Sequence, residues 1–134
     1  MIYLLDTNTC IRFLNGTSIL VRHRIDEVKP RDLVLCSVVK AELVFGALKS
    51  ALPEQNLRRL HSFFARFVSL PFDDAAAVVY GEIRRDLEQE GTPIGPNDVL
   101  IAAIARTNDL TLVSHNTREF QRVDGLQLED WEKE

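Results

Sequence analysis

The chain has 134 residues, of which 46% are hydrophobic and 27% are charged, and its formal net charge is −4. A chain of this size and composition can bury a hydrophobic core by itself, which excludes a coiled coil, a disordered tail and a disulfide-stapled scaffold. No apolar run approaches the roughly 20 residues of a membrane-spanning helix, and the first residues lack the basic region of a secretory signal. We therefore expect one cytoplasmic domain over residues 1–134, with no membrane association.

The cysteines and the distribution of charge add two expectations. Cys10 and Cys36 form no CxxC motif, so they are expected to be small buried side chains in a reducing compartment. Residues 1–66 contain ten Lys and Arg against six Asp and Glu, whereas residues 67–134 contain six against fourteen. The basic half is suited to an anionic partner, although ordinary solvated surface charge explains the same pattern equally well.

Short apolar segments alternate with segments of helical periodicity. In chain order, they predict a strand at 2–5, helices at 7–14 and 17–28, a strand at 33–36, helices at 37–50 and 53–66, a strand at 68–70, helices at 74–90 and 98–106, a strand at 110–113, a helix at 117–123 and an edge strand at 126–131. Ser37, Asp73 and Asn97 are predicted to cap helices. Strands separated by helices indicate an α/β fold, with a parallel sheet covered by helices on both sides.

The first candidate site residue is Asp6, which directly follows the first predicted strand. In an open parallel sheet, ligands bind beyond the carboxyl ends of the strands, so this position suits a functional carboxylate. An Asp at the start of a helix is also a common capping residue, and that explanation would suffice for Asp6 alone.

The second candidate, Glu42, lies on a face of the predicted helix 37–50 that carries no other charge. Its neighbours one turn away are Val38, Val39, Phe45 and Gly46. Removing a carboxylate from water on such a face costs several kcal/mol unless it is paired or binds a metal. An ion pair with Lys49 is the competing structural explanation.

The third candidate, Asp98, lies in the first turn of a helix whose residues 99–105 are all apolar. The helix dipole favours a negative charge at this end, so we expect Asp98 to stay ionised and able to hold a cation. An acidic residue in a first turn is also common without any ligand.

Together the three carboxylates indicate a metal site, because they would repel one another unless a cation lay between them. Oxygen ligands alone favour a hard ion, Mg²⁺ or Mn²⁺, which keeps several waters and accepts phosphate oxygens as further ligands. Such an ion can activate water for attack on phosphorus, which makes phosphodiester hydrolysis the expected reaction.

The sequence resembles a known family at four places: residues 2–8 (IYLLDTN), 41–43 (AEL) with Gly46 following, 93–98 (PIGPND) leading into 101–103 (IAA), and 128–131 (LEDW). These motifs, in this order and spacing, are similar to those of PIN-domain ribonucleases, and most of all to the VapC toxins of bacterial toxin–antitoxin pairs. The resemblance covers nearly the whole chain. It implies a three-layer PIN-like fold with four to five parallel strands and Mg²⁺- or Mn²⁺-dependent cleavage of RNA.

The resemblance also implies partners and residue roles. A homodimer and inhibition by a cognate VapB-type antitoxin, in a larger complex, are expected, with initiator tRNA as one RNA target. Asp6, Glu42 and Asp98 would be metal ligands, and Thr7 and Asn8 would be supporting polar groups. A non-catalytic PIN-like module that only binds RNA or protein is the alternative, although retention of all three acids speaks against it.

The last motif departs from the family pattern. Many members place an Asp a few residues before the Phe, whereas this chain has Ser114, Asn116 and Glu119 before Phe120. An amide oxygen is a weaker Mg²⁺ ligand than a carboxylate, so Glu119 is predicted to complete the catalytic site, with Ser114 and Asn116 supporting it. A surface ion pair between Glu119 and Arg122 is the competing explanation.

A last expectation concerns the helix at 53–66, whose apolar residues cover an unusually wide face. They are Leu57, Leu60, Phe63 and Phe64, with Phe67 just beyond the helix. We expect an antitoxin segment or a second protomer to cover part of this face. Ordinary burial in the core is an equally good explanation.

Overall fold

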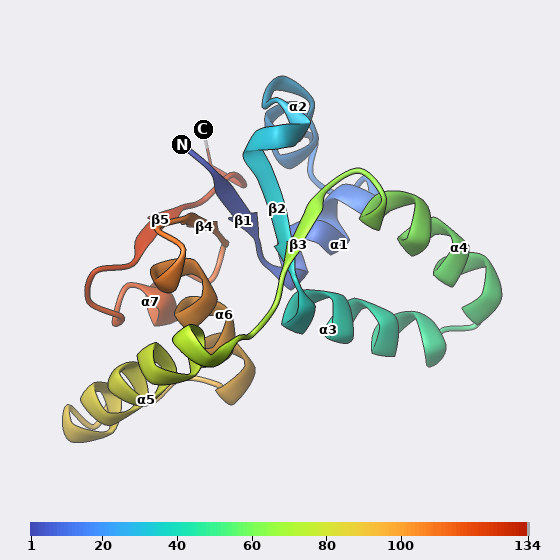
Figure 1. Ribbon diagram of the computed structural model, residues 1–134. Helices are drawn as coiled ribbons and strands as arrows, with labels where there is room; N and C mark the ends of the chain where they lie inside the picture. The colour runs from blue at the N-terminus through green and yellow to red at the C-terminus, as the bar shows by residue number, and fades with distance from the viewer. Residues whose placement is uncertain (134) are drawn as a thin grey trace.

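A computed structural model describes residues 1–133 and shows a five-stranded parallel sheet at the centre of the molecule (Figure 1). The strands are β1 (Tyr3–Leu5), β2 (Leu33–Cys36), β3 (Val68–Leu70), β4 (Thr111–Val113) and β5 (Gln127–Glu129). Their spatial order is β3-β2-β1-β4-β5, and every neighbouring pair is parallel. The predicted number of strands, their direction and the edge position of the last one are confirmed.

Within residues 1–133, seven helices surround this sheet. They are α1 (Thr7–Asn15), α2 (Ile19–Glu27), α3 (Ser37–Leu48), α4 (Pro53–Phe64), α5 (Asp74–Gln89), α6 (Pro96–Thr107) and α7 (Thr117–Phe120), with a 3₁₀ turn at Pro30–Asp32. In Figure 1, α1, α3 and α4 lie to one side of the strands, while α5, α6 and α7 lie to the other. The predicted α/β arrangement, with helices on both sides of the sheet, is therefore confirmed.

The core forms where β1, β2 and β4 meet the helices. All residues of β2 and β4 are buried, and in α6 every residue from Ile101 to Ala105 is buried. This accounts for the unbroken apolar runs in the sequence, because strands and helices covered on all sides need no polar face. Cys10 and Cys36 are buried free thiols, as predicted, and burial raises the pKa of the Cys10 thiol well above its usual value.

Two of the predicted helix caps are wrong. Ser37 is the first residue of α3 and not its cap, which is Cys36, and no side chain caps this helix. Helix α6 begins at Pro96 after Gly95, so Asn97 lies inside its first turn. Proline at the first helical position supplies a suitable φ angle and lacks the N–H that a cap would satisfy, which explains the earlier start.

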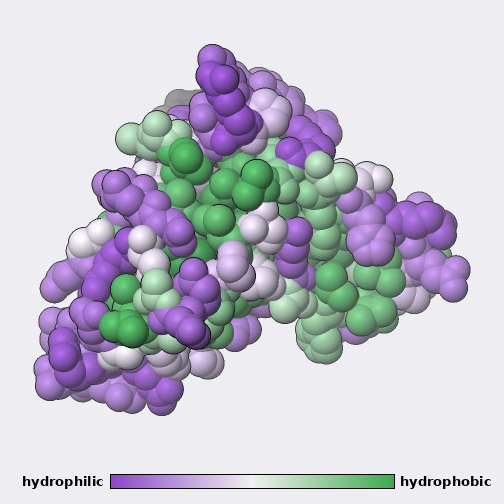
Figure 2. Space-filling model, viewed as in Figure 1, coloured by the Kyte–Doolittle hydropathy of each residue, from purple (hydrophilic) through white to green (hydrophobic). Residues whose placement is uncertain are grey.

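For α4 the structure favours the core-burial explanation, because most of its apolar residues face inward. Leu60, Phe63 and the following Phe67 are buried, and Leu57 and Phe64 are half-buried. The exposed large apolar side chains of this region lie instead on and just after α3: Phe45 is 63% exposed, Leu48 57% and Leu52 59%. Figure 2 shows the corresponding hydrophobic surface over α3.

The helices of the two halves of the sequence lie mostly on different sides of the sheet. The basic half supplies α1 to α4, and the acidic half supplies α5 to α7 (Figure 1). The acidic C-terminal segment returns to the basic half, where Glu132 pairs with Arg12 of α1 and Glu129 with Arg24 of α2. Among residues 1–133, no helix combines the length and hydropathy needed to cross a bilayer.

Candidate active site at the carboxyl edge of the sheet

Asp6 lies directly after β1 and is 6% exposed. Its Oδ1 accepts a hydrogen bond from the backbone N–H of Thr9 at 2.8 Å, so it does cap α1 as well as standing at the strand end. Burial raises the pKa of Asp6 above its usual value, and this effect is partly opposed by hydrogen bonds from Ser114 and Thr9. A buried carboxylate with few partners gains from a nearby cation.

Glu42 projects from α3 toward the same edge and is held by two side chains. The Thr7 hydroxyl donates a hydrogen bond to its Oε1 at 2.6 Å, and the Asn97 amide donates one to its Oε2 at 3.4 Å. The expected alternative, an ion pair with Lys49, is absent within residues 1–133, and the Lys49 ammonium lies over the Phe45 ring instead. In the described part of the chain, Glu42 therefore has hydrogen bonds that orient it but no cationic side chain paired with it.

Asp98, in the first turn of α6, is surrounded by negative charge. Its pKa is raised to about 6, first by burial and then by the charges of Glu119, Glu42 and Asp6. Desolvation and three nearby carboxylates outweigh the helix dipole, which favours the charged form, so Asp98 keeps its proton to a higher pH than an ordinary Asp and is ionised above about pH 6. The same effect shows that all four acids predicted from the sequence share one electrostatic environment.

Glu119, in α7, is half-buried beside this group. The Asn116 amide donates a hydrogen bond to its Oε2 at 3.3 Å, and the backbone N–H of Asn116 donates one to the Ser114 hydroxyl at 3.0 Å. The competing surface pair is absent, since Arg122 donates to the backbone oxygen of Pro93 and forms no ion pair among residues 1–133. Ser114 and Asn116 thus lie where support for the site was expected.

The polar residues that support the site are not all those expected from the sequence. Asn8 is exposed, and its side chain forms no hydrogen bond in the part of the chain that the structure describes. Thr9, which the sequence did not single out, is buried, and its hydroxyl donates to the backbone oxygen of Val113 at 3.3 Å. Asn97 was also missed as a site residue because its position before an apolar run indicated a cap.

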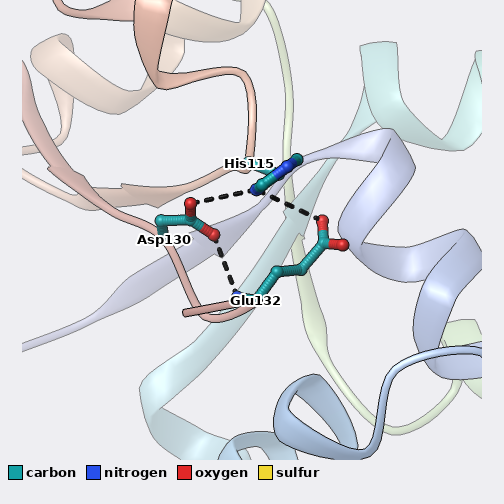
Figure 3. Close-up of side chains that lie close together, drawn as sticks. All are labelled: His115, Asp130 and Glu132. Atoms are coloured by element: carbon teal, nitrogen blue, oxygen red, sulfur yellow. Dashed lines mark hydrogen bonds and ion pairs between the residues drawn. The ribbon is translucent and has the colours of Figure 1, made fainter. Parts of the chain in front are cut away.

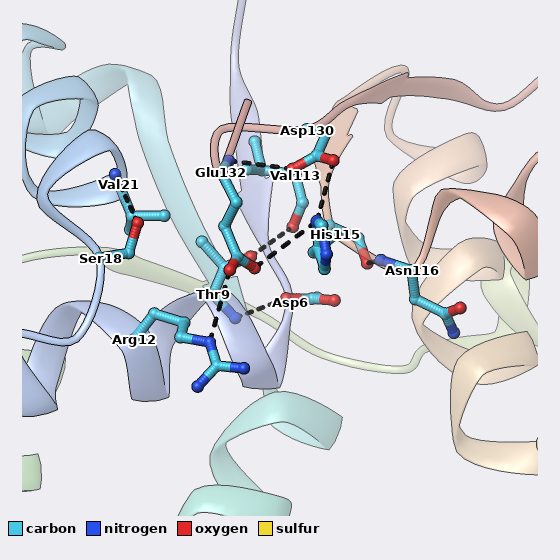
Figure 4. A network of polar contacts seen from close by, with 11 residues as sticks. Asp6, Thr9, Arg12, Ser18, Val21, Val113, His115, Asn116, Asp130 and Glu132 are labelled. Atoms are coloured by element: carbon cyan, nitrogen blue, oxygen red, sulfur yellow. Dashed lines mark hydrogen bonds and ion pairs between the residues drawn. The ribbon is translucent and has the colours of Figure 1, made fainter. Parts of the chain in front are cut away.

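A second polar group lies beside Asp6 and joins the end of the chain to β4 (Figures 3 and 4). His115 Nδ1 lies 3.0 Å from Asp130 Oδ2 and 3.9 Å from Glu132 Oε2, and Arg12 Nε lies 3.4 Å from Glu132 Oε1. The charge of Glu132 contributes to the raised pKa of Asp6. Mutual hydrogen bonds and ion pairs account for these side chains without an ion.

The four acids are linked by their charges and do not form a compact set of ligand atoms among residues 1–133. In that part of the chain, the potential metal-binding side chains whose ligand atoms are grouped are His115, Asp130 and Glu132, with these atoms within 4.8 Å of one another. Mg²⁺ commonly keeps several of its waters, so carboxylates can also hold it through its water shell.

The fold and this site define a class of protein: an α/β domain that gathers carboxylates beyond the carboxyl ends of its central parallel strands. Comparison with known families gives a match to the PIN domain over residues 3–126. The tRNA(fMet)-specific endonuclease VapC of Shigella flexneri is 43% identical over 129 residues, which cover 96% of this chain and 97% of that protein. Ribonuclease VapC2 of Rickettsia felis is 40% identical over 134 residues, covering 99% and 100%.

The solved structures agree with this assignment. The crystal structure of DNA-bound VapBC from Salmonella typhimurium matches with a TM-score of 0.91 and 39% identity, covering 98% of each chain. The chain therefore belongs to the PIN-domain family and, within it, to the VapC ribonucleases. The resemblance that the four motifs indicated is confirmed.

Proposed function

We propose that this protein is a toxin whose activity is Mg²⁺- or Mn²⁺-dependent hydrolysis of RNA phosphodiester bonds, controlled by a VapB-type antitoxin. The observation that carries the proposal is the raised pKa of Asp98, which arises from burial and from the charges of Glu119, Glu42 and Asp6. A buried carboxylate whose proton affinity is raised by three neighbouring carboxylates also favours a divalent cation at the same place.

Asp6, Glu42 and Asp98 would hold the cation, and Glu119 would complete the site. The donor set fits, because it consists of carboxylate oxygens with no thiolate and no imidazole among them. A bound Mg²⁺ or Mn²⁺ lowers the pKa of a coordinated water and neutralises charge on the departing oxygen.

The other side chains position these ligands. The Thr7 hydroxyl and the Asn97 amide donate to different oxygens of Glu42, so they fix the plane of its carboxylate. The Asn116 amide does the same for one oxygen of Glu119, and Ser114 supports both Asn116 and Asp6. A carboxylate oriented before it binds loses less conformational freedom when a ligand arrives.

The names of relatives support a particular substrate and partner. The Shigella flexneri relative is named for its specificity toward tRNA(fMet), so initiator tRNA is the substrate to test first. The structural relatives from Salmonella typhimurium and Rickettsia felis are VapBC assemblies bound to DNA, which supports an antitoxin partner. We further propose that residues 1–134 form a single PIN domain and that the protein is a homodimer.

The exposed apolar side chains on and after α3 support association with another chain. Phe45, Leu48 and Leu52 are each more than half exposed. Hydrogen exchange with and without the antitoxin tests this directly over residues 37–67. Added protection over 37–52 places a partner on α3, and no added protection anywhere in 37–67 contradicts antitoxin binding there.

The central test of the function compares two Asp→Asn variants. Asp98→Asn should reduce cleavage of initiator tRNA by on the order of a thousandfold, because it removes a charge that holds the cation. Asp74→Asn is the matched control, since Asp74 is an exposed acid in the first turn of α5 and should leave cleavage unchanged. Full activity of Asp98→Asn, or full wild-type activity in excess EDTA, would contradict the metal-dependent mechanism.

The same assay separates the enzyme from a non-catalytic binding module. A module that only binds RNA would retain the transcript without shortening it, with or without Mg²⁺. Cleavage that requires both Mg²⁺ and Asp98 excludes this alternative.

A further inference from the structure

An arginine-rich groove lies between α1 and α4, on the basic side of the molecule. Its volume is about 450 Å³, and Arg58, Arg59 and Arg66 line it together with Phe13 and Phe63. No carboxylate lines the groove, and none of these arginines forms an ion pair within residues 1–133. Three cations gathered without counter-charges produce a local positive potential that favours a polyanionic ligand.

Two of these arginines are held in place by neighbouring groups. The Arg66 guanidinium lies over the Phe13 ring at 5.5 Å and over the Phe67 ring at 5.1 Å. Arg59 donates a hydrogen bond to the backbone oxygen of Leu14 at the end of α1. Stacking and a single backbone contact restrict each guanidinium but leave several N–H donors unused, so less freedom is lost on binding an anion.

The groove is continuous with the acidic site through a second hollow between α1, α3 and α4. This inner hollow has a volume of about 230 Å³ and is lined by both Glu42 and Arg59. Leu14 and Arg59 line both hollows, which makes them one connected surface. Arg58 and Arg59 lie within α4, and Arg66 lies two residues beyond its end.

We infer that the groove binds the sugar–phosphate backbone of the RNA on one side of the bond to be cut. Guanidinium groups bind phosphate oxygens through paired N–H donors, and such contacts position a strand without reading its sequence. A strand that leaves the acidic site past Glu42 meets Arg59 first and then the outer arginines. This inference rests on the proposed ribonuclease function and adds to it a binding surface outside the acidic cluster.

The inference is tested by measuring RNA binding of variants that remove positive charge from the groove. Fluorescence anisotropy with a labelled initiator tRNA transcript, in an Asp98→Asn background that prevents cleavage, measures Kd at several salt concentrations. Arg58→Gln combined with Arg66→Gln should raise Kd at least tenfold and reduce the salt slope by about 1 to 2, since each phosphate contact contributes about 0.7 for a single strand. In the active protein, the same pair should raise KM while kcat stays within about twofold.

The matched control removes two positive charges elsewhere. Arg84→Gln with Arg85→Gln on α5 changes the net charge equally, and both side chains are already paired with acids. The single variant Arg58→Gln tests the groove without disturbing the fold, because Arg58 is exposed and Arg66 keeps its aromatic contacts. This single variant should raise Kd about threefold with an unchanged melting temperature.

Each other outcome contradicts the inference. If the groove double variant and the α5 double variant weaken RNA binding equally, only the net charge of the protein affects binding. Unchanged RNA binding together with lost antitoxin binding would identify the groove as a protein-binding surface. If the wild-type protein cleaves no RNA, the proposed function fails, whereas normal cleavage with unchanged KM in the groove variants overturns this inference alone.

Discussion

Asp98→Asn should make the metal-free protein more stable at neutral pH, even though it removes activity. In the folded protein the pKa of Asp98 is raised from 3.8 to about 6, mainly by burial and by the neighbouring carboxylates. The ionised form is therefore less favourable in the folded protein than in the unfolded chain. The folded state loses stability as the pH rises from about 4 through about 6, and a neutral amide removes this loss.

The magnitude follows from the pKa difference. A shift of about two units corresponds to about 3 kcal/mol at 1.36 kcal/mol per unit. Because Asp98 is only half-buried, solvent screening reduces this to about 1 to 1.5 kcal/mol. For a chain of this length that free energy raises the melting temperature by roughly 3 to 6 °C.

Urea unfolding in EDTA measures the effect at two pH values. At pH 7.5 the Asp98→Asn variant should be more stable than the wild type, and at pH 4 the two should differ little because Asp98 is then protonated. Asp74→Asn, in the first turn of α5, should show no such pH-dependent gain. Adding Mg²⁺ should reverse the order at pH 7.5, because only the wild type retains a strong site and gains stability from binding.

Two results would refute this reasoning. If Asp98→Asn has the same stability as the wild type at both pH values, burial and the neighbouring carboxylates do not disfavour the ionised form of Asp98 in the folded protein. If the variant is less stable at pH 7.5 without metal, the Asp98 carboxylate is engaged in a favourable contact in the folded state.

The remaining predictions concern metal binding, orientation of the ligands and thiol reactivity. Glu119→Gln should slow cleavage at least tenfold at limiting Mg²⁺ with little change in melting temperature, and wild-type rates would remove this acid from the site. Thr7→Val should lower kcat more than Thr7→Ser, because only the serine hydroxyl can still donate to Glu42. Apparent Mg²⁺ affinity, measured by titration calorimetry, should fall by about tenfold per pH unit below about 6, as protons compete for Asp98. Cys10 in the folded protein should resist a thiol reagent at pH 8, because its pKa is raised by complete burial, and rapid labelling would contradict this.

Much of the fold was predictable because its patterns are local. Buried parallel strands require short apolar runs, and α6, buried on all sides, requires an unbroken apolar stretch. Both features are visible in the sequence without any knowledge of contacts. These local patterns predicted the order of strands and helices along the chain, the parallel sheet and the edge position of β5.

The candidate acids could also be selected from the sequence, although for different reasons. Asp6 and Asp98 occupy ordinary positions at the start of a helix and stood out because Asp6 follows a strand and Asp98 precedes an apolar run, whereas Glu42 lies on an uncharged helix face. A charge on such a face is costly without a partner or a ligand. Sequence reasoning could therefore single out these positions, but it could not determine how the carboxylates influence one another.

The contacts that organise the site were decided by the tertiary structure. Asn97 looked like a helix cap, but the packing of α6 beside α3 directs its amide to Glu42, 55 residues away in the chain. The pKa of Asp98 is raised although the helix dipole acts in the opposite direction, because folding adds burial and three distant charges.

The apolar side chains of α3 and α4 show the same difference between what the sequence determines and what the tertiary structure determines. The sequence determined that α4 would be amphipathic and that α3 would be strongly apolar, since both properties depend on spacing alone. Only the tertiary structure decided that α4 buries Leu60 and Phe63 and that Phe45 and Leu48 of α3 stay exposed. The physical reason is that local periodicity determines which face of a helix is apolar, whereas burial depends on which other elements pack against that face.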